Sequence, residues 1–501
     1  MCRMIKREND MDKKLLALDE FLEKLFSEQN LAGMAVAIRG PQGDLIYKRG
    51  FGVRNLEKGL PIDEDTVCGI ASMSKSMVGL ACCMLQSEGK LKLSDPMTNY
   101  FPDLHIPGIP DEMVTVEQVA LHRAGLPPME PLEWSIAMNS VERDSSWYRE
   151  MVRTAPNKMD KIQQIVDYIT KGDYTPLGMP GEYMSYSNEG YALLSYVVDQ
   201  AAGIPLEEYL EQKIFRPLGM RRTVLDLDGS QARKLAGENM TSLFEEDEDG
   251  TLLQDDNWSV LPPFRGCACV KSTASDMTRY YKMLADGGRW EGRQVVPREA
   301  IERMVGRTYP TRKKPFYCMG LEKSLLNGKI VCKHSGGLHG VSSHGGFAEG
   351  EAGKGGYGIT ILCNQGDAAI QPFYDACFNY AVGLPLDRAS DWAQPCGREF
   401  SAPEMLCGDF LAKEGVPVHT VVSCENGKLK AMYGQTPADL LYCGANVFAA
   451  VDPKDHSKRI STFRFYIRNG SAWAVKCYTR IYQRVSESEH PAEETAEIKQ
   501  G

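Results

Sequence analysis

The chain is organised around the stretch Cys68-Gly69-Ile70-Ala71-Ser72-Met73-Ser74-Lys75-Ser76-Met77-Val78-Gly79. Ser72 precedes Lys75 by three residues at the start of a segment with the apolar period of a helix, so we expect the hydroxyl and the amine to lie one turn apart on one face. This is the arrangement of a nucleophile beside its base. Ser72 would also lie at the positive end of the helix dipole, which favours the anion formed when a serine attacks a carbonyl.

A Ser-x-x-Lys pattern by itself has a simpler interpretation, namely a helix cap followed by a surface charge. The same spacing recurs at Ser87 and Lys90, where a helix end with a solvated lysine explains it. The assignment of Ser72 as a nucleophile therefore depends on the rest of the chain.

Composition limits the class of protein. The chain has 501 residues, 43% hydrophobic and 25% charged, which is typical of a globular protein with two or three domains. Its formal charge of -10 argues against a nucleic-acid binder, which needs a basic face. Residues 1–12 show no secretory signal and no run approaches the roughly 20 apolar residues of a membrane span, so we expect a cytoplasmic protein with neither a membrane nor a nucleic-acid partner.

The fifteen cysteines are odd in number and scattered through apolar stretches, which favours buried free thiols over a disulfide framework. Cys267 and Cys269 suggest a metal site, but no second pair with ligand spacing accompanies them. His334, His339 and His344 are spaced by five, which fits neither a helical pair nor the usual zinc patterns. The sequence therefore predicts no metal and no cofactor.

The first part of the chain has the pattern of an α+β sandwich. An amphipathic helix is predicted over 12–30, and the strands Met34–Arg39 and Leu45–Arg49 flank the turn Gly40–Asp44. The helix that carries Ser72 follows this hairpin. A hairpin between two helices indicates a sheet covered by helices.

A second polar motif is Tyr186-Ser187-Asn188, on a predicted turn ahead of a buried helix over Ala192–Ala202. A Tyr-x-Asn there can aim a phenol and a carboxamide at one cavity, although a turn with an asparagine cap explains the residues equally well. His122 closes a predicted helix over Val114–Leu121, and a histidine before Gly-Leu-Pro is more often structural than catalytic.

The third stretch of chemical interest runs from Lys333 to Phe347 and is rich in glycine. It predicts an edge strand along which a substrate backbone can approach closely, because glycines leave room there. The acidic run Phe244–Gly250, in contrast, lacks the spaced ligands of a calcium loop and predicts only an exposed loop.

The C-terminal part changes to strands. Two Asn-Gly turns each separate two runs of alternating side chains, which predicts a small antiparallel β domain. We expect a proline-rich linker over 386–403, the β domain over 404–485 and a disordered acidic tail over 486–501. The expected strands are 418–424, 428–433, 461–467 and 472–482.

In this order, Ser72-Met73-Ser74-Lys75, Tyr186-Ser187-Asn188 and His334-Ser335-Gly336 resemble the motifs of the penicillin-recognising serine hydrolase family. This family holds class C β-lactamases, DD-carboxypeptidases, D-aminopeptidases and esterases. The resemblance covers about residues 20–385 and implies, after an N-terminal extension over 1–11, a β-lactamase-like α/β sandwich with a helical subdomain over 12–385. The C-terminal β domain resembles the barrel-like, lipocalin-like modules of some D-amino-acid peptidases in this family.

The resemblance also implies a mechanism. Ser72 would attack a carbonyl, a neutral Lys75 would accept its proton, and Tyr186 would pass that proton to the leaving group. The backbone N–H groups of Ser72 and Gly337 would form an oxyanion hole, a contribution of about 3 kcal/mol per donor in other hydrolases. Asn188 would hold Lys75 and a substrate amide, and His334 would orient Tyr186 or a polar substrate group. The residues expected to bind the substrate or the oxyanion are Asn188, His334, Ser335, Gly336 and Gly337.

The third motif departs from the Lys-Thr-Gly of class A enzymes, because His334 stands where a lysine would pair with a substrate carboxylate. A neutral histidine does this less well. The resemblance thus implies a serine hydrolase that forms an acyl-enzyme on Ser72 and acts on small peptides, amides or esters, as D-aminopeptidases and esterases do. A β-lactamase or DD-carboxypeptidase, and a non-catalytic binding protein on the same fold, stay open as alternatives. We expect a small-molecule or short-peptide substrate, and a homo-oligomer is compatible with the sequence.

Overall fold

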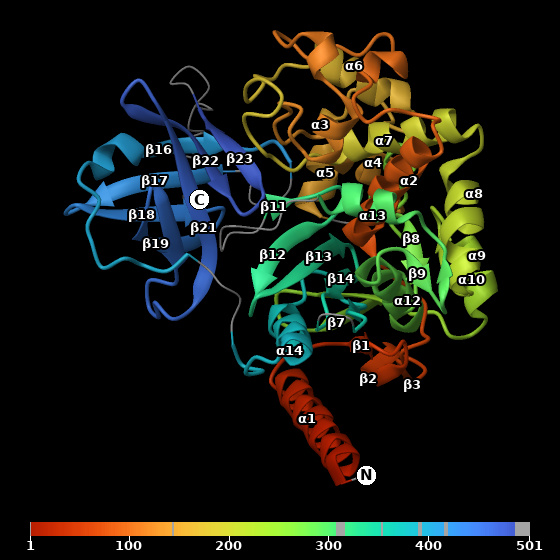
Figure 1. The fold of residues 1–501 in the computed structure, drawn as a ribbon. Helices are drawn as coiled ribbons and strands as arrows, with labels where there is room; N and C mark the ends of the chain where they lie inside the picture. Colours follow the sequence, from red (N-terminus) through yellow and green to blue (C-terminus); the bar gives the residue numbers. More distant parts are fainter. Residues whose placement is uncertain are drawn as a thin grey trace, which may run out of the picture. The chain divides into compact units, whose positions relative to one another are not determined.

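The computed structural model describes residues 2–142, 145–306, 316–351, 354–388, 393–414 and 419–485, with the side chains of the first helix described from Lys13 onward. The chain forms two compact units, each with its own core (Figure 1). The predicted boundaries near residues 385 and 404 stay predictions, and the predicted disordered tail over 486–501 lies outside the described residues. The first unit comprises residues 1–125, 131–183 and 187–391, and the second comprises 126–130, 184–186 and 392–501.

The first unit is built on an antiparallel sheet. In the described residues this sheet has eight strands in the order β11-β12-β13-β14-β15-β1-β2-β3, so that β1 pairs with β15 from much later in the chain. The predicted hairpin of β1 and β2 is confirmed, although β2 continues to Asn55 rather than ending at Arg49. The strands are β1 (Gly33–Arg39), β2 (Leu45–Asn55), β3 (Leu60–Pro61), β11 (Phe316–Tyr317), β12 (Glu322–Leu326), β13 (Lys329–Leu338), β14 (Val341–Ala348) and β15 (Tyr357–Cys363).

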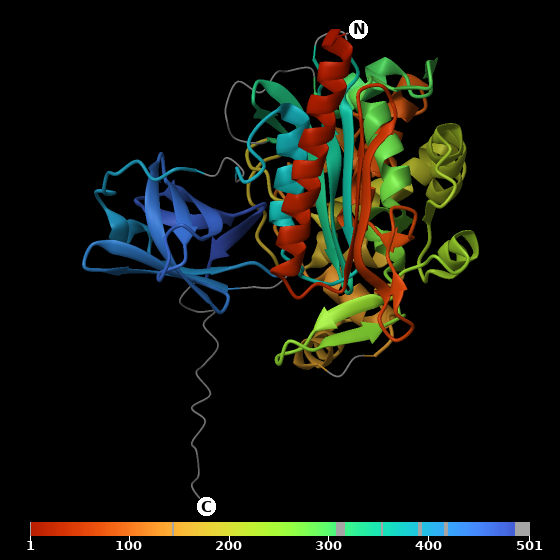
Figure 2. The ribbon, with the colours of Figure 1, turned by 90° about the horizontal axis from the view of Figure 1, so that it is seen from below.

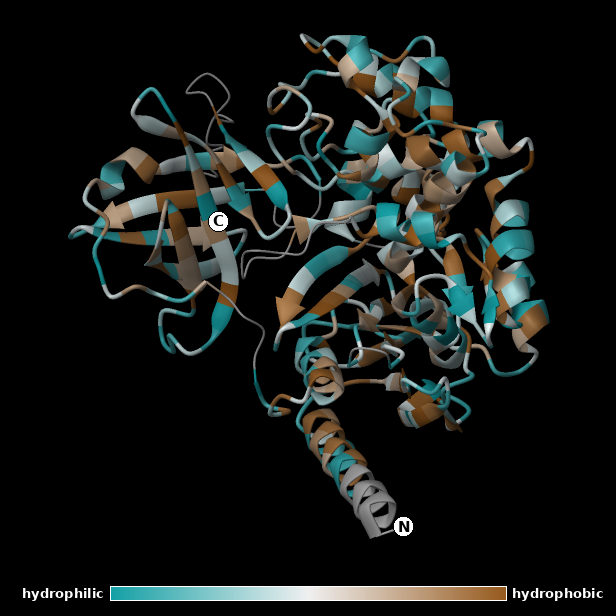
Figure 3. Cartoon of the chain, viewed as in Figure 1, coloured by the Kyte–Doolittle hydropathy of each residue, from teal (hydrophilic) through white to brown (hydrophobic). Residues whose placement is uncertain are grey.

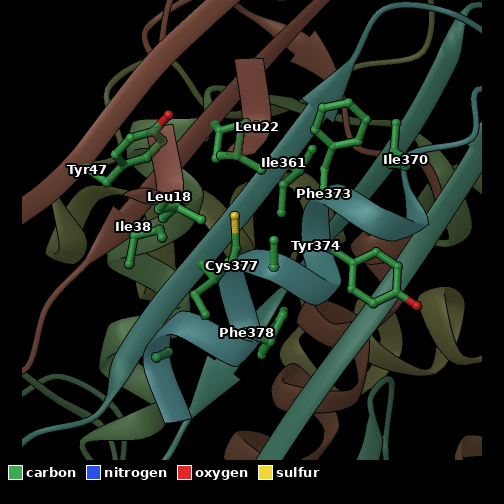
Figure 4. Packing of buried hydrophobic residues seen from close by; sticks show 14 of the residues in the cluster. Leu18, Leu22, Ile38, Tyr47, Ile361, Ile370, Phe373, Tyr374, Cys377 and Phe378 are labelled. Atoms are coloured by element: carbon green, nitrogen blue, oxygen red, sulfur yellow. The ribbon is translucent and has the colours of Figure 1, made fainter. Parts of the chain in front are cut away.

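One face of the sheet is covered by α1 (Cys2–Ser27) and α14 (Gln371–Val382), which also pack against each other (Figure 2). Bands of hydrophobic and hydrophilic residues alternate along α1 in Figure 3, as in a helix with one apolar face. The helix begins at Cys2 rather than at residue 12, because its charge-rich first turns lack the apolar period on which the prediction relied. The shared core, shown in Figure 4, includes Leu18, Leu22, Ile38, Ile361, Phe373 and Cys377.

The opposite face of the sheet is covered by α12 (Ala274–Ala285). Gly358 in β15 lies so close to this helix that a Cβ there would be 2.4 Å from the carbonyl oxygen of Thr278. The next residue, Ile359, belongs to the core under α1 and α14. Since successive side chains of a strand point to opposite faces, α12 and α14 lie on opposite sides of the sheet.

The other helices of the first unit include the one that follows the second motif. α7 (Asn188–Ala202) begins at Asn188 rather than at the predicted Ala192. Ser187 is the N-cap, because its hydroxyl accepts the backbone N–H of Gly190 at 3.1 Å, so Asn188 is the first helical residue and not a cap. The remaining helices are α2 (Lys75–Ser87), α3 (Val116–Ala120), α4 (Pro131–Asn139), α5 (Ser146–Thr154), α6 (Ile162–Lys171), α8 (Leu206–Leu210), α9 (Arg216–Leu218), α10 (Ser230–Ala236), α11 (Arg265–Ala268) and α13 (Arg298–Met304).

The acidic run over residues 244–250 is not the exposed loop that we predicted. β6 (Leu243–Glu246) pairs with β7 (Leu252–Asp255), and Phe244 is fully buried. The side chain of Asp247 closes the turn by accepting backbone N–H groups. The prediction was wrong because the charges that mark an exposed segment occupy the turn of a hairpin whose first strand is anchored by an apolar residue. The other short strands are β4 (Cys68–Gly69), β5 (Val224–Leu225), β8 (Val270–Ser272), β9 (Arg289–Trp290) and β10 (Arg293–Gln294).

The second unit contains a closed antiparallel barrel, which has eight strands in the described residues. The Asn-Gly turns at Asn426-Gly427 and Asn469-Gly470 are confirmed, with positive φ at all four residues as type I′ turns require. The single strand predicted over 472–482 is wrong: the chain turns at Tyr478, which has a φ of 54° although neither Gly nor Asn marks the turn. The strands are β16 (Gly408–Leu411), β17 (His419–Glu425), β18 (Lys428–Tyr433), β19 (Thr436–Gly444), β20 (Val447–Val451), β21 (Arg459–Arg468), β22 (Ser471–Cys477) and β23 (Arg480–Arg484).

The α+β sandwich and the antiparallel β domain are thus both confirmed. The cysteines whose side chains the structure describes are free, and most are buried, as the sequence predicts. Within the described residues, no helix is long and apolar enough to cross a membrane.

Candidate active site

The first motif forms a tight turn that leads into α2. Residues Ala71–Ser74 make a 3-10 turn, and Lys75 begins the helix. The side-chain nitrogen Nζ of Lys75 lies 3.1 Å from Oγ of Ser72. Lys75 is fully buried, whereas Ser72 is partly exposed. The structure therefore brings the predicted nucleophile and its predicted base within hydrogen-bond distance.

The turn before Ser72 is strained and held in place. Ala71 has a φ of 43°, a left-handed conformation that costs about 1 kcal/mol or more for a residue with a Cβ. The hydroxyl of Ser74 donates to the carbonyl of Ala71 at 2.7 Å, and that of Ser343 donates to the carbonyl of Ile70 at 2.8 Å. These bonds fix the backbone that presents the Ser72 side chain.

Cys267 in α11 links the first motif to the second. Its carbonyl oxygen accepts a hydrogen bond from Nζ of Lys75 at 3.2 Å, and its thiol donates to the carbonyl of Asn188 at 3.2 Å. The ring of Tyr191, one turn into α7, lies 5.9 Å from the Lys75 nitrogen. The sequence pointed to Cys267 only through a possible metal pair with Cys269, so its place beside Lys75 is a finding of the structure.

The third motif lies on β13, which is not an edge strand along its whole length. Within the described residues, β12 pairs with Lys329–Lys333 only, and Ser335–Leu338 pair with β14 alone. The single edge strand predicted over 333–347 is therefore wrong in two ways: the stretch forms the hairpin of β13 and β14, and β14 is an inner strand because it also pairs with β15. Within the described residues, the edge prediction holds only for the part of β13 that carries Gly336 and Gly337. The sequence missed the difference because β12 is short and polar in pattern.

Two adjacent glycines of β13 have different surroundings. A Cβ on Gly336 would lie 2.5 Å from the carbonyl oxygen of Ile70 and 2.9 Å from the backbone nitrogen of Ser72. A Cβ on Gly337 would have no atom within 4 Å, and this residue is exposed. The third motif thus packs closely against the backbone of Ile70 and Ser72 at Gly336, and it is exposed at Gly337.

His334 has a defined hydrogen-bonding state. Its Nδ1 lies 2.5 Å from the carbonyl oxygen of Ser335, and its Nε2 lies 3.0 Å from the hydroxyl of Tyr317. Because a carbonyl can only accept, Nδ1 carries a proton, and Nε2 of a neutral ring accepts from the Tyr317 hydroxyl. Both ring nitrogens are therefore engaged within the protein.

His122 supports the second motif, as the structural interpretation of this residue predicts. It is buried with a φ of 54°, and its Nδ1 accepts the backbone N–H of Ser187 at 3.1 Å. Its ring also packs on Tyr317, with centroids 4.5 Å apart. Tyr317, which the sequence did not single out, therefore contacts both His334 of the third motif and a residue that holds the second motif.

The three histidines of the glycine-rich stretch have separate surroundings. His339 contacts Glu245 and Asp255, whereas His344 stacks on Tyr374 with ring centroids 3.4 Å apart. Burial, reinforced by the charge of Lys333, lowers the pKa of His344 well below its ordinary value. Among the described residues, no group of three or more His, Cys, Asp or Glu side chains is arranged to hold a metal ion.

Tyr186 belongs to the second unit together with the barrel. It is buried, its backbone N–H donates to the carbonyl of Thr479 at 2.9 Å, and the guanidinium of Arg480 lies 4.6 Å from its ring centroid. The catalytic assignment of Tyr186 stays a prediction from its motif.

The sandwich and the contact between Ser72 and Lys75 are those of a β-lactamase-like fold. The chain belongs to the Beta-lactamase family, whose model matches residues 17–371 and whose members are serine hydrolases. The predicted resemblance and fold class are thereby confirmed.

Two curated relatives illustrate the range of this family. Penicillin-binding protein 4* of Bacillus subtilis (strain 168) is 26% identical over 277 residues, which are 53% of this chain and 55% of that protein. Esterase EstB of Burkholderia gladioli is 29% identical over 209 residues, 41% of this chain and 50% of the esterase. The chain spans about half the length of the curated relatives it matches.

Two solved structures share the fold. The octameric penicillin-binding protein homologue from Pyrococcus abyssi has a TM-score of 0.63 at 20% identity and covers 93% of this chain and 99% of its own. The D-amino acid amidase from Ochrobactrum anthropi SV3, complexed with D-phenylalanine, has a TM-score of 0.54 at 22% identity and covers 71% of this chain and 92% of its own. At these identities the likeness concerns the fold alone.

Proposed function

We propose that this chain hydrolyses small peptides, amides or esters, including those of D-amino acids, through an acyl-enzyme on Ser72. The observation that carries the proposal is the 3.1 Å distance between Oγ of Ser72 and Nζ of the fully buried Lys75. A serine with a base at this distance can lose its proton as it attacks a carbonyl carbon. The names of the relatives, an esterase and a D-amino acid amidase among them, support this class of substrate.

The acylation step follows from these groups. The bond from Ser72 Oγ to the carbonyl carbon forms while the hydroxyl proton moves to Nζ of Lys75, which acts as the base. The negative charge on the carbonyl oxygen is stabilised by the backbone N–H groups of Ser72 and Gly337, at the open end of β13. Tyr186 passes this proton from Lys75 to the leaving nitrogen or oxygen as its bond to carbon breaks, donating its own phenol proton and taking up the one from Lys75, and water later releases the acyl group from Ser72.

The third motif bears on which substrates are favoured. Both nitrogens of His334 are engaged, with Ser335 and with Tyr317, and a neutral ring offers no fixed charge to a substrate carboxylate. This favours amides and esters without a carboxylate beside the scissile bond over β-lactams and peptides ending in D-Ala-D-Ala. A β-lactamase or DD-carboxypeptidase is the second candidate, because members of the family carry these names.

The experiment that tests the proposal is intact-mass spectrometry after incubation with a fluorophosphonate probe. We expect one adduct on the wild type, none on Ser72→Ala and a strongly reduced amount on Lys75→Ala. Ser87→Ala and Lys90→Ala are matched controls with the same spacing, and they should label like the wild type.

A substrate panel then separates the candidates. D- and L-aminoacyl p-nitroanilides and p-nitrophenyl esters should be hydrolysed faster than the β-lactam nitrocefin. An unlabelled, inactive wild type would instead establish the non-catalytic binding protein, and preferential turnover of nitrocefin would establish the β-lactamase.

A further inference from the structure

The turn between β22 and β23 holds the segment Met184–Tyr186 inside the second unit. The backbone N–H of Tyr186 donates to the carbonyl of Thr479 at 2.9 Å. The hydroxyl of Ser185 accepts the backbone N–H of Ile481 at 3.1 Å, and the carbonyl of Met184 accepts from Nζ of Lys476 at 2.9 Å. Each of the three residues is thus tied to the barrel by its own hydrogen bond.

Arg480 adds a charged contact to the side chain of Tyr186. Its guanidinium carbon lies 4.6 Å from the ring centroid, within the range of a cation–π interaction. The guanidinium is held in this position by Glu414 at 3.2 Å and by the hydroxyl of Thr479 at 3.1 Å. Glu414 is itself buried, so the side chain that holds the Arg480 guanidinium has little freedom to move.

The guanidinium stays charged in this environment. Burial alone would lower the pKa of Arg480, but the carboxylate of Glu414 and the neighbouring Tyr186 raise it above its ordinary value. A permanent cation over the face of an aromatic ring resists rotation of the ring away from it, because the attraction depends on that geometry.

We propose that Arg480 is a positioning residue for Tyr186, which it holds in the orientation needed to protonate the leaving group. The inference rests on the proposed function, in which Ser72 Oγ bonds to the carbonyl carbon and its proton moves to Lys75. The bond from carbon to nitrogen breaks as the nitrogen takes a proton from the Tyr186 phenol, which regains one from Lys75. Arg480 would then act on the reaction through Tyr186, with which it shares the second unit.

The dependence of the rate on the leaving group distinguishes a positioning role of Arg480 from a purely structural one. An amide nitrogen must be protonated to leave, whereas p-nitrophenolate and fluoride leave without a proton. Loss of Tyr186 orientation should therefore slow the hydrolysis of a D-alanyl p-nitroanilide much more than that of the D-alanyl p-nitrophenyl ester. Fluorophosphonate labelling of Ser72 should change little.

The variants are chosen to avoid an unpaired buried charge. Arg480→Met is combined with Glu414→Gln, since removing the arginine alone would leave the Glu414 carboxylate uncompensated. We expect the ratio of amide to ester kcat/KM to fall at least about tenfold, a modest part of what general acid catalysis contributes. Arg480→Lys keeps the charge and should restore part of the ratio.

Arg468→Met is the matched control, because its guanidinium lies at the same 4.6 Å from the ring of Trp473 on the same barrel. This variant should leave the ratio unchanged. Amide and ester activities that fall equally in the Arg480 variant, or a similar drop in the Arg468 control, would overturn this inference alone. A wild type that neither labels nor hydrolyses either substrate would overturn the proposed function and the inference together.

Discussion

The two ends of α2 carry the same Ser-x-x-Lys pattern and differ in every physical respect. At the N-terminal end, Lys75 is fully buried and its nitrogen lies 3.1 Å from Ser72 Oγ. At the C-terminal end, the hydroxyl of Ser87 donates to the carbonyl of Cys83 at 3.2 Å. The nitrogen of Lys90 pairs with Glu88 at 2.8 Å, and its side chain is 45% exposed.

The comparison shows that the same spacing can lead to a buried contact or to a solvated helix end. Ser72 follows the strained residue Ala71 and is partly exposed, and Nζ of the buried Lys75 donates a hydrogen bond to the carbonyl of Cys267. Ser87 instead satisfies a carbonyl of its own helix end, and Lys90 is solvated. Spacing places two groups near each other, whereas burial and the backbone around them decide their chemistry.

Of the substitutions that test the difference between the two ends of α2, we expect Lys75→Met to have the largest effect on labelling. Lys75→Met keeps the length of the side chain in its buried site but removes the amine, so fluorophosphonate labelling should slow by at least about a thousandfold. Lys90→Met should label within about twofold of the wild type, as expected for an exposed ion pair. Intact-mass time courses give the labelling rates of both variants, and thermal melting shows whether both are folded. Equal losses in both variants would remove the distinction between the two ends.

The next largest effect is expected at Gly336, where β13 packs against the backbone of Ile70 and Ser72. In Gly336→Ala, the added methyl would overlap the carbonyl of Ile70, which should cost about 1–3 kcal/mol of unfolding free energy and slow labelling of Ser72 about tenfold. Gly337→Ala has open space around the new methyl and should melt like the wild type. Denaturant titration of both variants provides the measurement. A stable, fully active Gly336→Ala would show that β13 does not constrain Ser72.

A smaller effect is expected at Tyr317. Tyr317→Phe removes the hydroxyl that donates to His334 Nε2, a bond worth about 1 kcal/mol, so kcat/KM should fall about fivefold. Tyr281→Phe is the control, because the hydroxyl of this buried tyrosine has no hydrogen-bond partner among the described residues. Steady-state kinetics on the preferred ester compare the two. If both variants keep full activity, the hydroxyl of Tyr317 does not support the third motif.

The sequence predicted well wherever the local pattern is sufficient. The hairpin of β1 and β2, the Asn-Gly turns and the Ser72–Lys75 pair all depend on residues close together in the chain. The turn at Tyr478 escaped prediction, because a tyrosine carries no turn signal in the sequence even where its φ is positive in the structure.

Contacts across long sequence distances were also missed. The carbonyl of Cys267 beside Lys75 and the hydroxyl of Tyr317 on His334 bring together separate elements of the fold. A carbonyl has no signature in a single sequence, and one tyrosine among twenty-two is indistinguishable from the others. The support of the site therefore becomes visible only when the sheet and the helices are assembled.

The smallest effect is expected at Glu88, at the C-terminal end of α2, and it concerns the pH dependence of the unfolding free energy. Burial alone would raise the pKa of Glu88, but Lys90 and Lys213 outweigh it and hold the pKa below its ordinary value of 4.5. A carboxyl with a lowered pKa in the folded state adds stability above pH 4.5, and this contribution is lost as the pH falls through the folded-state value. Glu88→Gln should therefore lower the unfolding free energy by about 1 kcal/mol or less at pH 7, and the difference from the wild type should shrink below pH 4.5.

Thermal melting from pH 7 to pH 3.5 measures this difference, with Glu57→Gln at an exposed position as the control. The labelling rate of Ser72 should stay at the wild-type value in both variants, because Glu88 acts at the end of α2 that carries Lys90 and not at the end that carries Lys75. A difference in stability that grows toward acid would mean that the ion pairs of Glu88 do not stabilise the folded state. A change in labelling would mean that the two ends of the helix are coupled, and that the buried pair depends on its exposed counterpart.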